Sequence, residues 1–285
     1  MKSTTVVTLF LSMVLCSSVV SANPIKPMFE EAIRAYSAKD YKTAIAILEK
    51  INEIYPSFAP TYNYLGLCYK ESGSSGEDIK WLFEKAIEID PNYADPYDNL
   101  AKLYYAMTDF EKAEENGLKA VELNPDFATA HLTLGWIYLL GKSQPADAIE
   151  HFDKITGQNS DIPYAQFGLG MAYHMEHQSF RVLEMVTKLR QAGREDLAQQ
   201  LEGVIRSGKY QTDLVPGMPL IAQPRAEVAV KEDQLTFTDD EETKKVPVRL
   251  GTAPVNSEPA QQLTSDSPQE RLRALRRRGM QAQGR

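Results

Sequence analysis

The chain has 285 residues, of which 43% are hydrophobic and 25% are charged. Its 39 aspartates and glutamates outnumber its 31 lysines and arginines, which gives a net charge of −8 at pH 7. Because the phosphates of nucleic acids require a basic footprint, this acidic balance argues against a nucleic-acid partner.

The first 22 residues form a segment of their own. Residues 1–22 begin with one charged residue, Lys2, continue through an apolar run over residues 6–15, and end in small residues at Ala22. This order predicts a secretory signal peptide, and therefore an exported protein that is periplasmic or secreted. An uncleaved membrane anchor is the alternative, although the apolar run is short for a span. Cleavage would leave Cys68 as the only cysteine, which we interpret as a small buried hydrophobic residue.

A pattern of apolar and small residues then recurs at a spacing of 34 or 35 residues. It appears three times as Tyr62-x2-Leu65-Gly66-x2-Tyr69, Tyr97-x2-Leu100-Ala101-x2-Tyr104 and His131-x2-Leu134-Gly135-x2-Tyr138. The apolar residues of each unit fall at helical spacing, and the small residue lies where two helices must approach closely. Pro91 and Pro125 mark the ends of second helices, because proline cannot continue a helix.

This period and pattern resemble the tetratricopeptide repeat (TPR) family. The resemblance implies an all-α, right-handed solenoid of helix hairpins whose concave face binds other proteins. One hairpin cannot cover its own apolar face, so the units must stack. We place about five repeats, at residues 25–58, 59–93, 94–127, 128–162 and 163–193.

Three details of the repeats lead to further expectations. The second repeat has its extra residue in the turn at residues 72–76, and the fourth near residues 142–145. In the third repeat Gly117 replaces the usual aromatic residue, which leaves a gap or room for a neighbouring side chain. Residues 194–207 have the apolar spacing of one more helix, which would cap the solenoid of residues 23–207.

Residues 208–285 differ in composition from the repeats and predict a mostly disordered, low-complexity tail. Within it, residues 227–250 alternate weakly and could form short strands. Residues 268–279 predict a short basic helix, for which Ser267 is a suitable N-cap. This arginine-rich end could contact a membrane surface or nucleic acid, could fold back onto the acidic solenoid, or could simply be solvated.

The TPR resemblance also implies a partner-binding groove, formed by the concave side of each first helix. The groove residues are Asn63, Asp98, Asn99, Lys102, Leu132, Trp136, Leu139, Leu140, Phe167 and Met171. They change from polar and acidic in the second and third repeats to apolar and aromatic in the fourth and fifth. A large exposed apolar surface marks an interaction site. The alternative is that these side chains pack internally, against the cap helix or the tail.

Few residues indicate catalysis or metal binding. His174 and His177 are three residues apart at a helix end, a spacing compatible with a metal, but no further ligand clusters with them. The sequence has neither a glycine-rich phosphate loop after a strand nor a Gly-x-Ser-x-Gly element. We therefore expect no catalytic residue, no metal and no cofactor.

Together these features predict a non-catalytic scaffold or assembly factor of the cell envelope, which binds a protein or peptide partner in the TPR groove. One alternative is an accessory subunit of an enzyme complex, or a weak metal-binding protein that uses His174 and His177. Another is a membrane-surface adaptor that acts through its arginine-rich C-terminus, since the tail is the only part that could contact a membrane.

Overall fold

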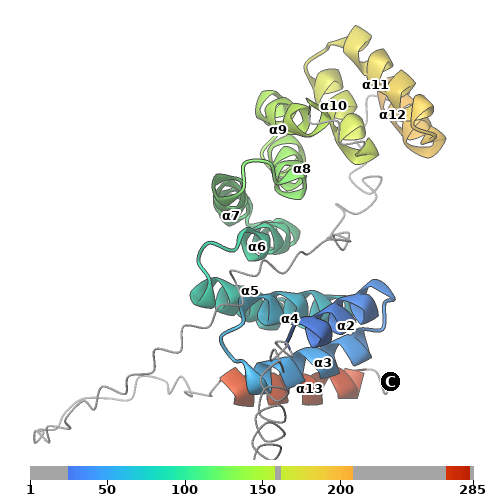
Figure 1. The fold of residues 1–285 in the computed structure, drawn as a ribbon. Coiled ribbons are helices and arrows are strands. Elements are labelled where there is room, and N and C mark those ends of the chain that lie inside the picture. Colours follow the sequence, from blue (N-terminus) through green and yellow to red (C-terminus); the bar gives the residue numbers. More distant parts are fainter. Residues whose placement is uncertain (1–24, 158–161, 208–267, 283–285) are drawn as a thin grey trace, which may run out of the picture.

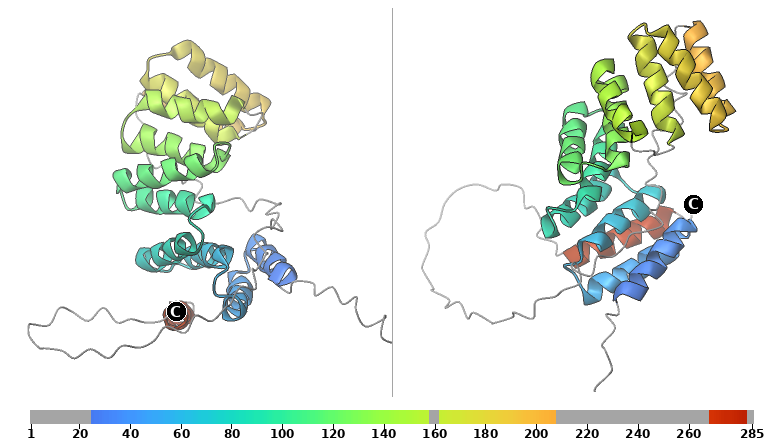
Figure 2. Two further views of the ribbon diagram at one scale, coloured as in Figure 1. Left: turned by 60° about the vertical axis from the view of Figure 1, so that its left-hand side comes forward. Right: turned by 45° about the horizontal axis from the view of Figure 1, so that its top comes forward.

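The computed structural model describes residues 25–157, 162–207 and 268–282, and all regular elements in these ranges are helices (Figure 1). Successive helices pair into hairpins that stack into a curved, elongated solenoid (Figure 1 and Figure 2). The paired helices are α2 (Ile25–Ser37) with α3 (Tyr41–Ile54), α4 (Ala59–Glu71) with α5 (Gly76–Ile89), α6 (Ala94–Ala106) with α7 (Phe110–Leu123), α8 (Ala128–Trp136) extended by η1 (Ile137–Gly141) with α9 (Pro145–Gly157), and α10 (Pro163–Met175) with α11 (Ser179–Gln191). The five-hairpin α-solenoid predicted from the repeats is confirmed.

Two further helices complete the described chain. Helix α12 (Glu195–Ser207) packs on α10 and α11, with Leu197 and Leu201 fully buried, so it is the expected cap of the last hairpin. Helix α13 (Pro268–Ala282) covers the region where the sequence predicts a basic helix. The predicted signal segment and the weakly strand-like residues 227–250 lie outside the described residues.

The hairpin turns use one recurring local structure. A residue with positive φ ends most first helices, as in Lys39 and Thr108, which both have φ of 60°. After Lys39 and Thr108 the next residue is an aspartate that caps the second helix: Asp40 accepts from the backbone N–H of Thr43 at 3.1 Å, and Asp109 from that of Lys112 at 3.2 Å. Such a cap satisfies a backbone donor that the helix itself leaves unpaired.

The two extra residues of the repeat pattern are absorbed in different ways. In the second repeat the extra residue lies in the turn between α4 and α5, as the pattern indicates. In the fourth repeat the expected position near residues 142–145 is wrong. There the first helix itself is longer, because η1 is a π-helical turn in which the N–H of Lys142 bonds to the carbonyl of Ile137 at 2.9 Å. A π-turn holds one more residue than an α-turn, so the hairpin keeps its register.

Small residues allow the helices of one hairpin to meet closely. A Cβ atom built on Gly66 would lie 2.5 Å from the ring of Phe83, and one on Gly135 would lie 2.4 Å from the ring of Phe152. At Gly117 the nearest atom would be a methyl carbon of Leu134, at 2.7 Å. Leu134 therefore fills the room that the missing aromatic residue leaves in the third repeat.

We predict that Gly135→Ala lowers the free energy of unfolding by about 1–3 kcal/mol, because the new methyl group overpacks the contact with Phe152. Gly203→Ala is the matched control, since nothing lies within 4 Å of that exposed helical position. The free energy of unfolding of the control should rise by about 0.5–1 kcal/mol, because alanine has a higher helix propensity than glycine. Urea unfolding of both variants tests the contact, and equal effects of the two changes would refute it.

A histidine pair, of which His131 is buried and His151 half-buried, links α8 to α9. The Nε2 atom of His131 lies 3.0 Å from the carbonyl oxygen of Pro125, to which it can donate. His131 Nδ1 can then accept the Nδ1–H of His151, also at 3.0 Å. The ring of Tyr138 stacks on His151 with a centroid distance of 5.4 Å. Burial, followed by the proximity of His131, lowers the pKa of His151 from 6.5 to about 4.

This histidine pair should make stability pH-dependent. Because His151 in the unfolded chain binds a proton at a higher pH than in the fold, stability should fall as pH decreases from about 6.5 to about 4. His151→Asn keeps a neutral donor for His131 and removes the titration, so the variant should lose less stability over the same range. Denaturant unfolding at pH 7 and pH 4.5 measures the difference. If the difference in unfolding free energy between the wild type and the variant is the same at both pH values, His151 is not the group responsible.

Candidate partner-binding sites

The ten residues assigned to the groove lie on the first helices α4, α6, α8 with η1, and α10. Nine of them are buried, with exposed fractions of 6% or less, and only Leu140 is partly exposed. Their burial corrects the expectation of an open apolar surface. Their participation in partner binding stays a prediction.

The aromatic members of this set pack on each other. The ring of Trp136 meets Phe152 of α9 edge to face at 5.3 Å between centroids, and it lies 6.3 Å from Phe167 of α10. Trp136 is 1% exposed, and its Nε1–H has no hydrogen-bond partner in the described structure. Trp136 therefore contributes to packing between two repeats, and these contacts are with α9 and α10, not with the cap helix or the tail that the sequence alternative named.

The polar members form a row that connects three repeats. Asn99 of α6 donates to the side-chain oxygen of Asn63 on α4 at 2.9 Å. Asp98 accepts from Lys102 on its own helix at 2.6 Å and from the hydroxyl of Thr133 on α8 at 2.7 Å. Thr133 could not be identified from the sequence, because a single threonine within an apolar helix carries no signal of its partner.

The Asp98–Lys102 ion pair is buried, with side-chain exposures of 3% and 5%. Asp98→Leu leaves the Lys102 cation buried without its carboxylate, which should cost about 3–5 kcal/mol of stability. Adding Lys102→Met removes the stranded charge and should restore much of that loss. Thr133 keeps its other hydrogen bond, to the carbonyl of Thr129 at 2.9 Å, in both variants. Urea unfolding compares them, and a double variant as unstable as the single one would disprove the pairing.

The C-terminal helix α13 fills a groove between the second helices α3 and α5. Leu272 and Leu275, one turn apart, are 5% and 1% exposed in this groove. The guanidinium of Arg271 lies 4.6 Å from the ring centroid of Trp81. Arg276 forms an ion pair with Glu49, at 3.3 Å between Nη1 and Oε2. Of the alternatives for the basic end of the chain, the structure shows the helix folded back onto the solenoid.

Glu49 is the polar centre of this groove. Its second carboxylate oxygen accepts a hydrogen bond from the hydroxyl of Tyr69 at 3.2 Å. Burial raises the pKa of the Glu49 carboxyl, while the Arg276 cation and the Tyr69 hydrogen bond act in the opposite direction. The half-buried carboxylate thus gains from the arginine that α13 brings, and Leu272 and Leu275 supply the apolar contact.

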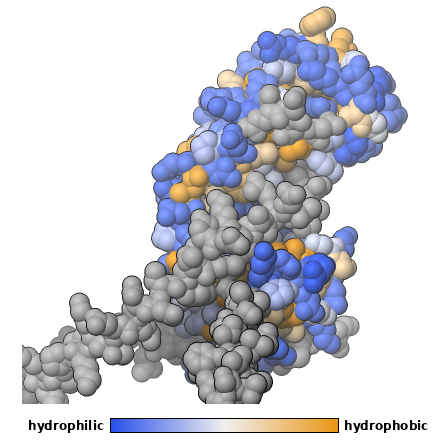
Figure 3. Space-filling model, viewed as in Figure 1, coloured by the Kyte–Doolittle hydropathy of each residue, from blue (hydrophilic) through white to orange (hydrophobic). Residues whose placement is uncertain are grey.

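Exposed apolar side chains occur at the opposite end of the molecule, on α11. Phe180 is 83% exposed and Leu183 is 58% exposed. Figure 3 shows hydrophobic side chains at this tip of the solenoid, surrounded by hydrophilic ones. An exposed phenylalanine beside a cleft is a candidate contact for a partner.

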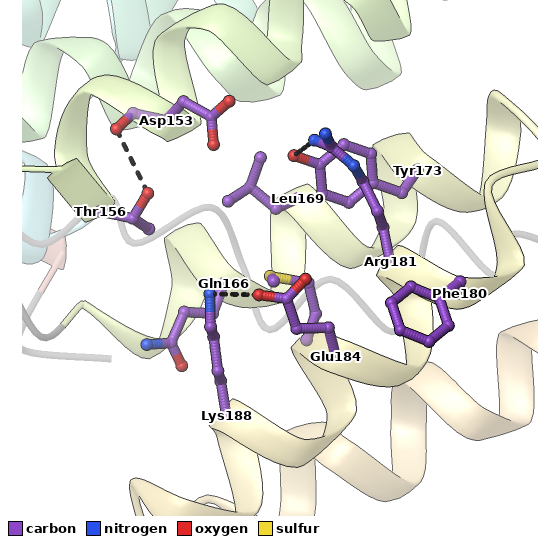
Figure 4. Close-up of a pocket in the computed structure, with 10 residues that line it drawn as sticks. Asp153, Thr156, Gln166, Leu169, Tyr173, Phe180, Arg181, Glu184 and Lys188 are labelled. Carbon is purple, nitrogen blue, oxygen red and sulfur yellow. Dashed lines mark hydrogen bonds and ion pairs between the residues drawn. The ribbon is translucent and has the colours of Figure 1, made fainter.

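Beside Phe180 lies a cleft of about 500 Å³ between α9, α10 and α11 (Figure 4). Helix α9 contributes the polar residues of one wall, α10 contributes the floor, and α11 contributes the other wall. The lining residues are Asp153, Thr156, Gln166, Leu169, Tyr173, Phe180, Arg181, Glu184, Met185 and Lys188. This cleft could not be identified from the sequence, since its residues come from three helices and follow no motif.

Most charges of the cleft are paired within it. Arg181 donates to the hydroxyl of Tyr173 at 2.8 Å, and Lys188 lies 2.8 Å from the carboxylate of Glu184. The Thr156 hydroxyl donates to the backbone carbonyl of Asp153 at 3.2 Å, and Figure 4 shows no dashed line from the other lining residues to the Asp153 carboxylate. Burial raises the pKa of Asp153, and the nearby cations of Arg181 and Lys188 oppose this.

A second acceptor at the cleft is also unsatisfied. The Oε1 atom of Gln166 is buried and has no hydrogen-bond partner in the described structure. Unpaired buried acceptors are uncommon, because each loses its hydration without a replacement. Together with Asp153, this oxygen makes the cleft suited to a ligand that brings hydrogen-bond donors or a cation.

The residues considered for chemistry show little sign of it. Burial raises the pKa of the Cys68 thiol to about 12, so its reactive thiolate is disfavoured. His177 lies in the turn after α10 with φ of 56°. Within residues 25–157, 162–207 and 268–282, no three His, Cys, Asp or Glu side chains are grouped to hold a metal ion. None of the helices in these ranges combines the length and apolar character of a membrane span.

Comparison with known families agrees with the repeat geometry. Two family profiles, both described as tetratricopeptide repeat, match residues 82–115 and 99–161. The chain is a tetratricopeptide repeat protein. A relative in sequence is the uncharacterized protein ycf37 of Pyropia yezoensis, 40% identical over 73 residues. That match covers 26% of this TPR chain and 40% of the relative.

Solved structures of other proteins share the solenoid fold. Pseudomonas aeruginosa PilF superposes with a TM-score of 0.53 at 18% identity, over 64% of this chain and 90% of PilF. A thermophilic TPR protein of Thermus thermophilus gives 0.52 at 18% identity, over 64% and 98% of the two chains. A tetratricopeptide repeat protein from Parabacteroides merdae gives 0.52 at 17% identity, over 63% and 71%. At these identities the likeness shows the TPR fold alone.

Proposed function

We propose that this TPR protein is a non-catalytic scaffold or assembly factor of the cell envelope, which holds a segment of a protein partner along its first helices. The polar row across three repeats is the main support. Because Asn63, Asn99, Asp98 and Thr133 join successive first helices by direct hydrogen bonds, those helices are held in fixed relative positions. A surface fixed in this way loses little entropy when a partner binds.

The location in the envelope is supported by the first 22 residues, whose order of charged, apolar and small residues is that of a secretory signal. A scaffold is favoured over a membrane-surface adaptor by the position of α13. Arg271 and Arg276 contact Trp81 and Glu49 on the solenoid, so the docked helix offers fewer free cations to a lipid surface.

Site-specific cross-linking in cells tests the proposed function. A photoreactive amino acid at Leu140, the partly exposed member of the groove, should capture a partner. The same amino acid at Glu115, exposed on the second helix α7, is the matched control and should capture much less. Sequencing of the purified protein should find a mature N-terminus at Asn23. Equal capture from both positions would contradict groove binding, and an intact N-terminus in a cytosolic fraction would contradict export.

A further inference from the structure

The groove that holds α13 and the open cleft at α9–α11 occupy the same place in the repeat. Glu49 is the ninth residue of α3, and Asp153 is the ninth residue of α9. Tyr69 is the eleventh residue of α4, and Tyr173 is the eleventh residue of α10. Both sites therefore lie between two consecutive second helices, with a carboxylate on one wall and a tyrosine beneath it.

The correspondence extends to the other residues that the two sites use. Asn52 beside α13 and Thr156 in the open cleft are each the twelfth residue of their helix. Trp81, over which Arg271 lies, is the sixth residue of α5, and its counterpart on α11 is Glu184. The open cleft thus repeats the polar layout of the filled groove, with an acidic residue in place of the aromatic one.

The two sites differ in occupancy. At the filled groove Arg276 of α13 pairs with Glu49, and two leucines cover the apolar floor. At the open cleft the corresponding carboxylate, Asp153, has no hydrogen-bond or ion-pair partner among the other lining residues drawn in Figure 4, and Phe180 is 83% exposed at the rim. The chain therefore shows the bound form of one groove and the open form of its equivalent.

We propose that the α9–α11 cleft binds a basic amphipathic helix of a protein partner, seated as α13 is seated between α3 and α5. Such a helix would place two apolar side chains, one turn apart, over Leu169 and Met185 and against Phe180. One of its cations would pair with Asp153, and a second would reach Glu184. This site is separate from the groove of the proposed function and uses the second helices.

The charges already in the cleft permit this docking. Glu184 and Lys188 are each 48% exposed, and an ion pair with such exposure contributes little, so an incoming cation can replace Lys188. Arg181 is held by the Tyr173 hydroxyl on the wall of the cleft. The unpaired oxygen of Gln166 adds an acceptor for a donor on the helix.

The occupant is assigned to another protein because the chain's own basic helix is already seated. Leu272 and Leu275 are buried against the first two repeats, so moving α13 to the cleft would leave the groove between α3 and α5 uncovered and separate Arg276 from Glu49. A partner helix with the same arrangement of leucines and arginines meets no such cost.

A fluorescent peptide of residues 266–285 serves as the probe, titrated by anisotropy into the mature full-length protein. We expect saturable binding that Asp153→Lys weakens by about tenfold, roughly 1.4 kcal/mol. Glu150→Lys is the matched control, since it makes the same charge change at an exposed position of the same helix and should leave the affinity unchanged. Phe180→Asp, at an exposed site that folding does not require, should weaken binding as well.

Three results would overturn the proposal. The first is no saturable binding by the folded wild-type protein. The second is binding that Glu49→Lys abolishes and Asp153→Lys leaves intact, because the peptide would then occupy the groove of α13. The third is self-association of the unlabelled protein, seen by sedimentation and removed by Asp153→Lys, because the occupant would then be α13 of a second copy. Cross-linking at Leu140 tests the first-helix groove of the proposed function, and its outcome does not depend on any of these three results.

Discussion

The stacking of this solenoid depends on how closely the two helices of each hairpin can approach. At Gly66 and Gly135 the space of a side chain is taken by the ring of Phe83 or Phe152 from the second helix. With the ring in that space, the apolar faces of adjacent repeats meet and exclude water, which is the main stabilising contribution in a repeat protein. The polar row, the filled groove and the open cleft all lie on helices whose spacing these contacts set.

The architecture could be predicted from the sequence because it follows from a period. Recurrence of Leu-Gly or Leu-Ala before a tyrosine identifies the first helices α4, α6, α8 and α10, and the prolines Pro91 and Pro125 mark two boundaries between hairpins. The cap was also predictable, since a solenoid must cover its last apolar face and Leu197 and Leu201 have helical spacing. The π-turn at residues 137–141 could not be predicted, because an extra residue can be accommodated in a helix or in a turn with the same sequence length.

The candidate sites were much less predictable. The repeat pattern indicates which side of its own helix a residue occupies, whereas burial depends on the neighbours that other helices bring. Trp136 was expected to be open and is enclosed by Phe152 and Phe167, which come from α9 and α10. The α9–α11 cleft is defined by three helices together, and Asp153 differs from any other surface aspartate only once its neighbours are placed.

The docking of α13 gives the protein a property that repeat arrays ordinarily lack. In a simple solenoid each unit contacts only its neighbours, so either end can fray without affecting the other. Here the contact between Arg276 and Glu49 joins the last described helix to the first repeat, although the two are more than 200 residues apart in the sequence. Opening of the first hairpin must release the C-terminal helix, and release of that helix must expose the first two repeats. The first hairpin and α13 therefore form one cooperative unit, and the free end of the described array is the one that carries α11 and α12.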